Sequence, residues 1–229
     1  MSALQDNELL FGDGFTVFEF SEDGWAWGQA KVDRYVGYVQ AHELAEPLEM
    51  THRITALSTP VLWGPDVKRA TRDMLPLNAL VRPLAREKGF ALIAPDSFIF
   101  ADHIAPLDRL APDWVATAER FVGAPYVWGG KTVAGIDCSG LVQTALAFAG
   151  IASPRDTDQQ EAALGADCPF LARKRGDLVF WNGHVGIMID ETRLIHANAF
   201  HMQVEIEPLE DAIARIAQIV GPVNAIKRL

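Results

Sequence analysis

The sequence predicts an α+β fold, with an all-β N-terminal half and a C-terminal domain in which helices precede a series of strands. From Leu9 to about Leu107, short apolar runs alternate with turn residues, and no stretch has the spacing of a long amphipathic helix. After residue 112, two helical patterns are followed by four strand-like runs. Helices followed by consecutive strands indicate an antiparallel sheet.

The N-terminal half contains two segments with a similar pattern. Residues 9–44 and 74–104 each read as a strand, a turn that pairs glycine with an aromatic residue, a second strand, an aromatic strand and a short closing turn. An extra strand and loop precede the second segment and have no counterpart before Leu9. We therefore predict two small all-β barrels, over 1–48 and 49–108, and the first is a candidate for an incomplete barrel.

A further domain is predicted over 112–229, after the linker-like stretch IAPLDRLAPDW. Pro112 and Asp113 can start a helix that runs to Phe121. The next helix begins near Cys138, carries apolar residues on one face and stops at Gly150. Strands are expected at 177–181, 184–190, 193–198 and 203–207, then a helix at 208–216 and a last strand at 223–229.

Charge and composition exclude several classes of function. The net charge of −10 and the pI near 5.0 argue against binding to nucleic acid or to an anionic membrane, and leave a peptide substrate open. The N-terminus has no basic segment followed by an apolar one, and no run approaches the roughly 18 apolar residues of a membrane span. Two cysteines cannot form the dense disulfide framework of a small secreted domain. We therefore expect a cytoplasmic protein.

Cys138 is a candidate nucleophile because it stands where an apolar helix begins. A thiolate at a helix N-terminus faces unpaired backbone N–H groups and the positive end of the helix dipole. The alternative is packing, because free cysteines are commonly buried, and for these residues alone it is the more frequent case.

Two histidines supply what a nucleophilic cysteine needs, namely a base and a group that orients the base. His184 opens the strand HVGIMID, and His196 lies in the next apolar run, LIHAN. If these runs pair as a hairpin, the two imidazoles lie on one face and one can orient the other. Taken singly, each histidine is more often a hydrogen-bonded residue at a strand end. Their combination with Cys138 favours catalysis.

The runs GAPYVWGGKTVAGIDCSGLVQ, RKRGDLVFWNGHVGIMI and LIHAN resemble the NlpC-type cell-wall cysteine peptidases, which have a papain-like fold. The strand YVGYV and the Gly-Trp pair before it resemble bacterial SH3 domains, which accompany the peptidase in members that cut murein peptides. The resemblance implies that Cys138 is the nucleophile, His184 the base and His196 the polar third member. It also implies that Tyr126 helps the Cys138 backbone N–H to bind the oxyanion, and that no cofactor is required.

The resemblance further implies a substrate pocket. In members with SH3 domains, the residues flanking the cysteine, here Asp137 and Ser139, hold the free amine of an N-terminal L-alanine. Asp137 is equally a preferred helix N-cap, and the two roles are compatible. Trp128 and Thr157 are expected in the same pocket, with Thr157 where the family usually has serine. Tyr38 is a candidate to close it, against the alternative of packing within an aromatic SH3-like core.

The implied function is hydrolysis of the γ-D-glutamyl-L-diamino acid bond in murein peptides with a free N-terminal L-alanine. Two alternatives keep the same three residues: an acyltransferase or transglutaminase-like enzyme, in which aspartate usually stands in place of His196, and an inactive murein-peptide-binding protein. A metal site formed by Cys138, His184 and His196 lacks the paired ligand spacing of zinc sites.

Overall fold

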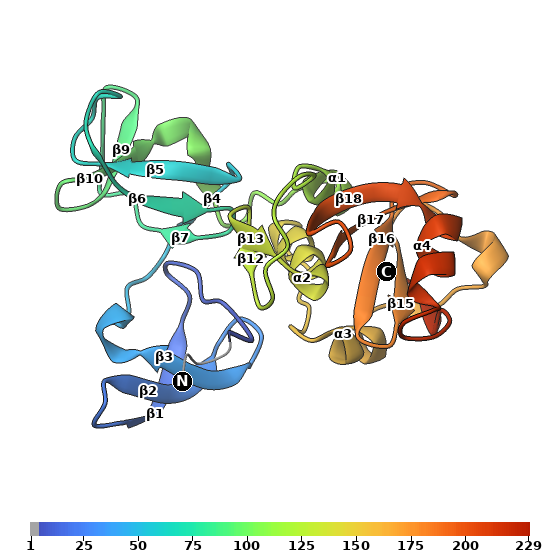
Figure 1. The fold of residues 1–229 in the computed structure, drawn as a ribbon. Coiled ribbons are helices and arrows are strands. Elements are labelled where there is room, and N and C mark those ends of the chain that lie inside the picture. Colours follow the sequence, from blue (N-terminus) through green and yellow to red (C-terminus); the bar gives the residue numbers. More distant parts are fainter. Residues whose placement is uncertain (1–4) are drawn as a thin grey trace. The chain divides into compact units, whose positions relative to one another are not determined.

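The structure, a computed structural model, describes residues 5–229 and divides into two compact units (Figure 1). One unit comprises residues 9–109, and the other combines the residues up to Glu8 with residues 110–229. The first four residues of the predicted domain 1–48 lie outside the described residues. The C-terminal unit thus begins near the expected position and also includes a short N-terminal segment. In the described part of the chain, no helix is long and apolar enough to cross a membrane.

The unit of residues 9–109 is β-rich, as predicted. Strands β1 (Phe15–Phe20), β2 (Trp25–Ala30) and β3 (Val36–Gln40) form one antiparallel sheet with β2 in the centre. The remaining strands are β4 (His52–Ile54), β5 (Ser58–Leu62), β6 (Thr71–Pro76), β7 (Leu80–Val81), β8 (Ala85–Glu87), β9 (Phe90–Ala94), β10 (Ser97–Phe100) and β11 (Ile104–Pro106). They form sheets of order β6-β5-β10-β9-β8 and β11-β4-β7, and two 3-10 turns, η1 (Ala41–Glu43) and η2 (Ala101–His103), complete the unit.

The β-rich, SH3-like fold class is confirmed, but the sheets of the described residues are open, so the two predicted barrels are not closed. Closure requires the outer strands of a sheet to pair with each other. In the first sheet both β1 and β3 pair with β2 instead. The apolar core of the unit gathers around Ile54, Val81 and Ile99.

The C-terminal unit contains the predicted antiparallel sheet. Its order is β14 (Ala166–Asp167), β19 (Ala225–Arg228), β15 (Asp177–Trp181), β16 (His184–Met188), β17 (Arg193–Asn198) and β18 (Gln203–Pro208). The helices are α1 (Trp114–Glu119), α2 (Cys138–Phe148), α3 (Thr157–Ala163) and α4 (Leu209–Ile216), with the small hairpin β12 (Lys131–Thr132) and β13 (Gly135–Ile136) and the turn η3 (Phe170–Ala172). Every element predicted after residue 112 is present, whereas α3 was not predicted.

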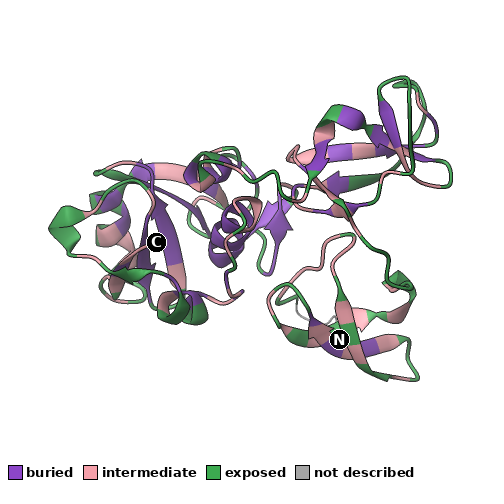
Figure 2. Ribbon diagram, turned by 180° about the vertical axis from the view of Figure 1, so that it is seen from behind, coloured by how far each residue is buried: buried purple, intermediate pink, exposed green. Residues whose placement is uncertain are grey.

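Helices α2 and α4 lie on opposite sides of the central strands (Figure 1). Strands β15 to β17 are consequently buried on both faces and form the interior of the unit (Figure 2). Helix α4 packs Leu209 and Ala212 against Trp181 and Leu194 of the sheet. Helix α2 is buried almost all round, from Cys138 to Leu146. This burial fixes the start of α2 beside the sheet.

Candidate active site

Cys138 is the first residue of α2, and Asp137 caps the helix. The Asp137 carboxylate accepts a hydrogen bond from the Gly140 N–H at 2.7 Å, which confirms the predicted N-cap role. Glycine at 140 is required by a close approach, because a Cβ there would overlap with the Gly130 carbonyl oxygen. The DCSG sequence therefore lets the helix start tightly against the chain that precedes it.

The Cys138 thiol is enclosed, with a residue exposure of 6%. Its Sγ lies 3.9 Å from the Thr157 hydroxyl oxygen. Burial and the Asp137 charge raise the pKa of Cys138, while the Val185 N–H, the Thr157 hydroxyl and the Ser139 N–H act in the opposite direction. Since Val185 directly follows His184, the thiol lies at the start of β16, where the predicted base is located.

The two histidines lie as the hairpin prediction requires. Strands β16 and β17 are antiparallel, with Ile187 opposite Ile195, and the Nε2 of His184 lies 2.8 Å from the Nδ1 of His196. Burial, reinforced by His196 and the positive charge of Arg215, lowers the pKa of His184 to about 3. His184 is therefore neutral at physiological pH, and one of its ring nitrogens has a free lone pair.

Sequence reasoning missed two residues behind His196. The Nε2 of His196 lies 2.6 Å from an oxygen of Glu207, and the guanidinium of Arg215 binds both oxygens of that carboxylate. Glu207 could have been found from the alternation of side chains along QVEIE, because alternate residues of a strand lie on one face. Strand β18 pairs with β17, and Glu205 and Glu207 lie on the face that carries His196. Arg215 gave no comparable signal because it comes from α4.

Replacing His184 with alanine should reduce activity more than replacing His196. His184 is the predicted proton acceptor, whereas His196 contacts His184 and orients it. Steady-state rates of both variants, measured at one pH on one substrate, provide the comparison. A larger loss in His196→Ala would reverse the two roles.

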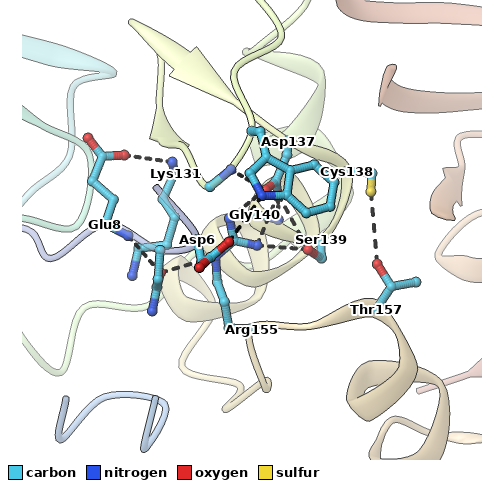
Figure 3. Close-up of polar contacts among 12 residues, drawn as sticks. Asp6, Glu8, Lys131, Asp137, Cys138, Ser139, Gly140, Arg155 and Thr157 are labelled. Carbon is cyan, nitrogen blue, oxygen red and sulfur yellow. Dashed lines mark hydrogen bonds and ion pairs between the residues drawn. The ribbon is translucent and has the colours of Figure 1, made fainter. Parts of the chain in front are cut away.

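Asp137 and Ser139 belong to a buried network centred on Arg155 (Figure 3). Arg155 donates to both Asp137 oxygens, at 3.0 and 2.5 Å, and to the Ser139 hydroxyl at 2.7 Å. With the Gly129 N–H, the Gly140 N–H and the Ser139 hydroxyl, the carboxylate accepts five hydrogen bonds. The charge of Asp137 is therefore balanced inside the protein, and the amine-binding role of Asp137 and Ser139 stays a prediction.

Residues 5–8, which we call the N-terminal strap, contact this network from the other end of the sequence (Figure 3). The Asn7 side-chain oxygen accepts from Arg155 at 3.1 Å, and Glu8 accepts from the Lys131 backbone N–H at 2.7 Å. Asp6 lies 3.4 Å from the Trp128 indole nitrogen. Neither Arg155 nor the strap was predicted as part of the site, although Arg155 stands two residues before Thr157 in PRDTDQQ.

The remaining predicted residues occupy different surroundings. Tyr126 is half-buried, and burial together with the charges of Cys138 and Asp137 raises its pKa to about 12, so the hydroxyl keeps its proton. Trp128 is 63% exposed, and Thr157 is buried beside Cys138. Tyr38 lies in the other unit, where its ring packs 4.7 Å from that of Trp27. Tyr38 is 62% exposed, so the contact does not place it in a closed core, and the predicted substrate roles stay predictions.

Family comparison agrees with this geometry. Residues 123–219, which contain the cysteine helix and both histidines, match the NlpC/P60 family. The chain therefore contains an NlpC/P60 domain. Residues 2–44 match the bacterial dipeptidyl-peptidase SH3 domain. The resemblance inferred from the motifs is thus confirmed.

Two relatives extend the likeness along most of the chain. Dipeptidyl-peptidase 6 of Lysinibacillus sphaericus is 29% identical over 208 residues, which are 90% of this chain and 72% of the relative. The γ-D-glutamyl-L-lysine dipeptidyl-peptidase of Bacillus subtilis is 25% identical over 201 residues, which are 78% of this chain and 65% of the relative. An NlpC/P60 family protein from Bacillus cereus has a similar fold, with a TM-score of 0.81 at 20% identity over 97% of this chain and 81% of that one.

Proposed function

We propose that the protein is a cysteine peptidase that hydrolyses the γ-D-glutamyl-L-diamino acid bond of murein peptides with a free N-terminal L-alanine. The observation that carries the proposal is the position of the Cys138 thiol, next to the Val185 N–H at the start of β16, together with the hydrogen bond between His184 of β16 and His196 of β17. Nucleophile, base and orienting group are the parts that covalent catalysis requires. The substrate class follows the relative named γ-D-glutamyl-L-lysine dipeptidyl-peptidase.

In the proposed reaction, the Cys138 sulfur attacks the γ-carbonyl carbon of D-glutamate while its proton passes to His184. The negative charge on the carbonyl oxygen meets the Cys138 backbone N–H and the hydroxyl of Tyr126, which stays protonated. His184 then gives its proton to the departing amine of the diamino acid. Water, with its proton taken by His184, releases the acyl group and restores the thiol.

Charge around the start of α2 supports selection for a free amine. Asp6, Glu8 and Asp137 supply three carboxylates to the network there, against the two cations Lys131 and Arg155. The surplus negative charge favours an ammonium group, and an acetyl cap removes that positive charge.

The free tripeptide L-Ala-γ-D-Glu-diamino acid should be cut with a kcat/KM about 100-fold or more above that of its N-acetylated form, since loss of a charge contact is worth a few kcal/mol. Mass spectrometry of the products, with Cys138→Ala protein as the control, measures both rates. Equal values of kcat/KM would contradict amine selection, and no cleavage of either peptide would contradict the proposed function.

We also propose that the enzyme acts in the cytoplasm on peptides recycled from the cell wall. A demand for a free N-terminal amine restricts the substrate to peptides already released from the murein polymer. Cys138 and Cys168 are both free thiols, which a reducing compartment maintains. Immunoblots of fractionated cells should find the protein with cytosolic markers. Its presence in the envelope or medium would contradict this location.

A further inference from the structure

His196 uses both of its ring nitrogens in hydrogen bonds. Its Nδ1 lies 2.8 Å from the Nε2 of His184, and its Nε2 lies 2.6 Å from the Oε1 of Glu207. The His196 side chain is completely buried and that of Glu207 nearly so. A neutral imidazole has one donor and one acceptor nitrogen, so the group at one side determines what the other side can do.

Glu207 determines which atoms donate and which accept in this chain of hydrogen bonds, because its carboxylate can only accept. Arg215 donates to its Oε2 at 2.7 Å and to its Oε1 at 2.5 Å. Burial opposes ionisation, but the bonds from Arg215 and His196 lower the pKa of Glu207 to about 2. An ionised carboxylate has no proton to donate. The Nε2 of His196 must therefore carry the hydrogen.

The same logic continues to His184. Arg215 already balances the charge of Glu207, and burial lowers the pKa of His196, so His196 is neutral and its Nδ1 is an acceptor. The Nε2 of His184 must then be the donor in the bond between the two rings. In neutral His184 the lone pair consequently lies on Nδ1.

We infer that Glu207, fixed by Arg215, is a positioning residue that selects the tautomer of His196 and, through it, that of His184, so that Nδ1 of His184 is the nitrogen that deprotonates Cys138. The inference deepens the proposed function and rests on it for the catalytic step. When the S–H bond breaks, the proton goes to Nδ1, and no proton has to leave His196 or Glu207.

Arg215 is itself held in place for this role. It lies in the last turn of α4, where a cation interacts favourably with the helix dipole. Its guanidinium carbon also lies 4.4 Å from the centre of the Phe200 ring. A bidentate bond from a fixed arginine keeps the carboxylate in one orientation.

Glu207→Gln is the test variant, because an amide of the same size can donate as well as accept. Donation from the introduced amide to the His196 Nε2 would reverse both tautomers and place a hydrogen on the His184 Nδ1. In a serine peptidase triad, a reversed histidine tautomer lowers kcat by about 10⁴-fold. Glu207 is one residue further from the base than the aspartate of that triad, so we expect a smaller fall in kcat, of about 100-fold, with KM changed by less than about threefold. Glu205→Gln is the matched control, since Glu205 lies opposite His196 in the strand register but binds Gln203.

The direct readout is the tautomer of each histidine in ¹⁵N-labelled protein at pH 7.5, assigned with single-histidine variants. Wild type and Glu205→Gln should both show hydrogen on Nε2 of His184 and His196, and Glu207→Gln should not. A wild-type spectrum with hydrogen on the His196 Nδ1 would overturn the inference without any variant, as would Glu207→Gln with unchanged tautomers and kcat.

Alkylation by iodoacetamide separates this inference from the proposed function, because it needs no peptide substrate. If the Nδ1 of His184 deprotonates Cys138, a hydrogen on that nitrogen in Glu207→Gln leaves less thiolate. Alkylation of Cys138 should then be about tenfold slower in Glu207→Gln than in wild type, with Cys168 as the internal reference. Slower alkylation together with altered tautomers would support the inference even if the tripeptide were not cut. Equal alkylation rates would overturn it.

Discussion

Replacing Cys138 with alanine should abolish cleavage of the free tripeptide, with a loss in kcat on the order of 10⁴-fold or more, as for removal of a nucleophile in other peptidases. The fold should persist because alanine keeps the Cβ and the helix remains capped by Asp137. The thiol's contact with the Thr157 hydroxyl is long, at 3.9 Å, so its loss costs little. Product analysis by mass spectrometry measures turnover, and circular dichroism with thermal unfolding measures the fold.

Cys168→Ala is the control for the same chemical change elsewhere in the chain. Cys168 is half-buried, and its sulfur lies 3.6 Å from the Pro169 carbonyl oxygen, in the loop before η3. This variant should retain full activity. A Cys138→Ala protein with even a tenth of the wild-type turnover would exclude Cys138 as the nucleophile.

The elements that the sequence predicted carry strong local signals. The helix of Cys138 has a capping residue, an apolar face and a glycine stop, and strands β15 to β18 alternate with turn residues. Short spacing along the chain also made the pairing of His184 with His196 predictable, since a hairpin brings such residues together. Helix α3 was missed because TDQQEAA is short and polar and has no apolar period.

The contacts that sequence reasoning missed join distant parts of the chain. Arg155 reaches Asp137 because the loop after α2 returns to the start of that helix, and no periodic pattern encodes this path. The contact of Asn7 with Arg155 spans most of the chain, and the strap is too short to show a pattern. The open form of the predicted barrels could not be foreseen either, because strand spacing gives the number of strands but not whether the outer strands meet.

Breaking the buried ion pair between Arg155 and Asp137 should have the largest effect on stability. Their side chains are 1% and 7% exposed, and either single change leaves the other charge buried. Such a change typically costs about 3 to 5 kcal/mol, which corresponds to a fall of about 10 °C or more in Tm for a domain of this size. We expect losses of this order for Asp137→Asn and for Arg155→Met in thermal and urea unfolding.

A matched surface pair provides the control. Arg193 and Asp190 lie 2.8 Å apart with side chains 55% and 37% exposed, and Arg193→Met should change stability by less than about 1 kcal/mol. The double variant of Asp137 and Arg155 should lose less stability than the sum of the two single variants, because neither charge then remains unpaired. Additive losses would show that the two residues do not act as a pair.

The same variants test the predicted amine role of Asp137 at a temperature where both are folded. In wild type, Arg155 balances the carboxylate that an ammonium group would contact. Arg155→Met removes this competing cation, so the preference for the free over the acetylated tripeptide should be kept or increased even as kcat falls. Asp137→Asn removes the carboxylate, and the preference should fall. If the ratio of the two kcat/KM values stays at the wild-type level in Asp137→Asn, Asp137 does not select the amine, and its part is to hold the start of α2 through Gly129, Gly140 and Arg155.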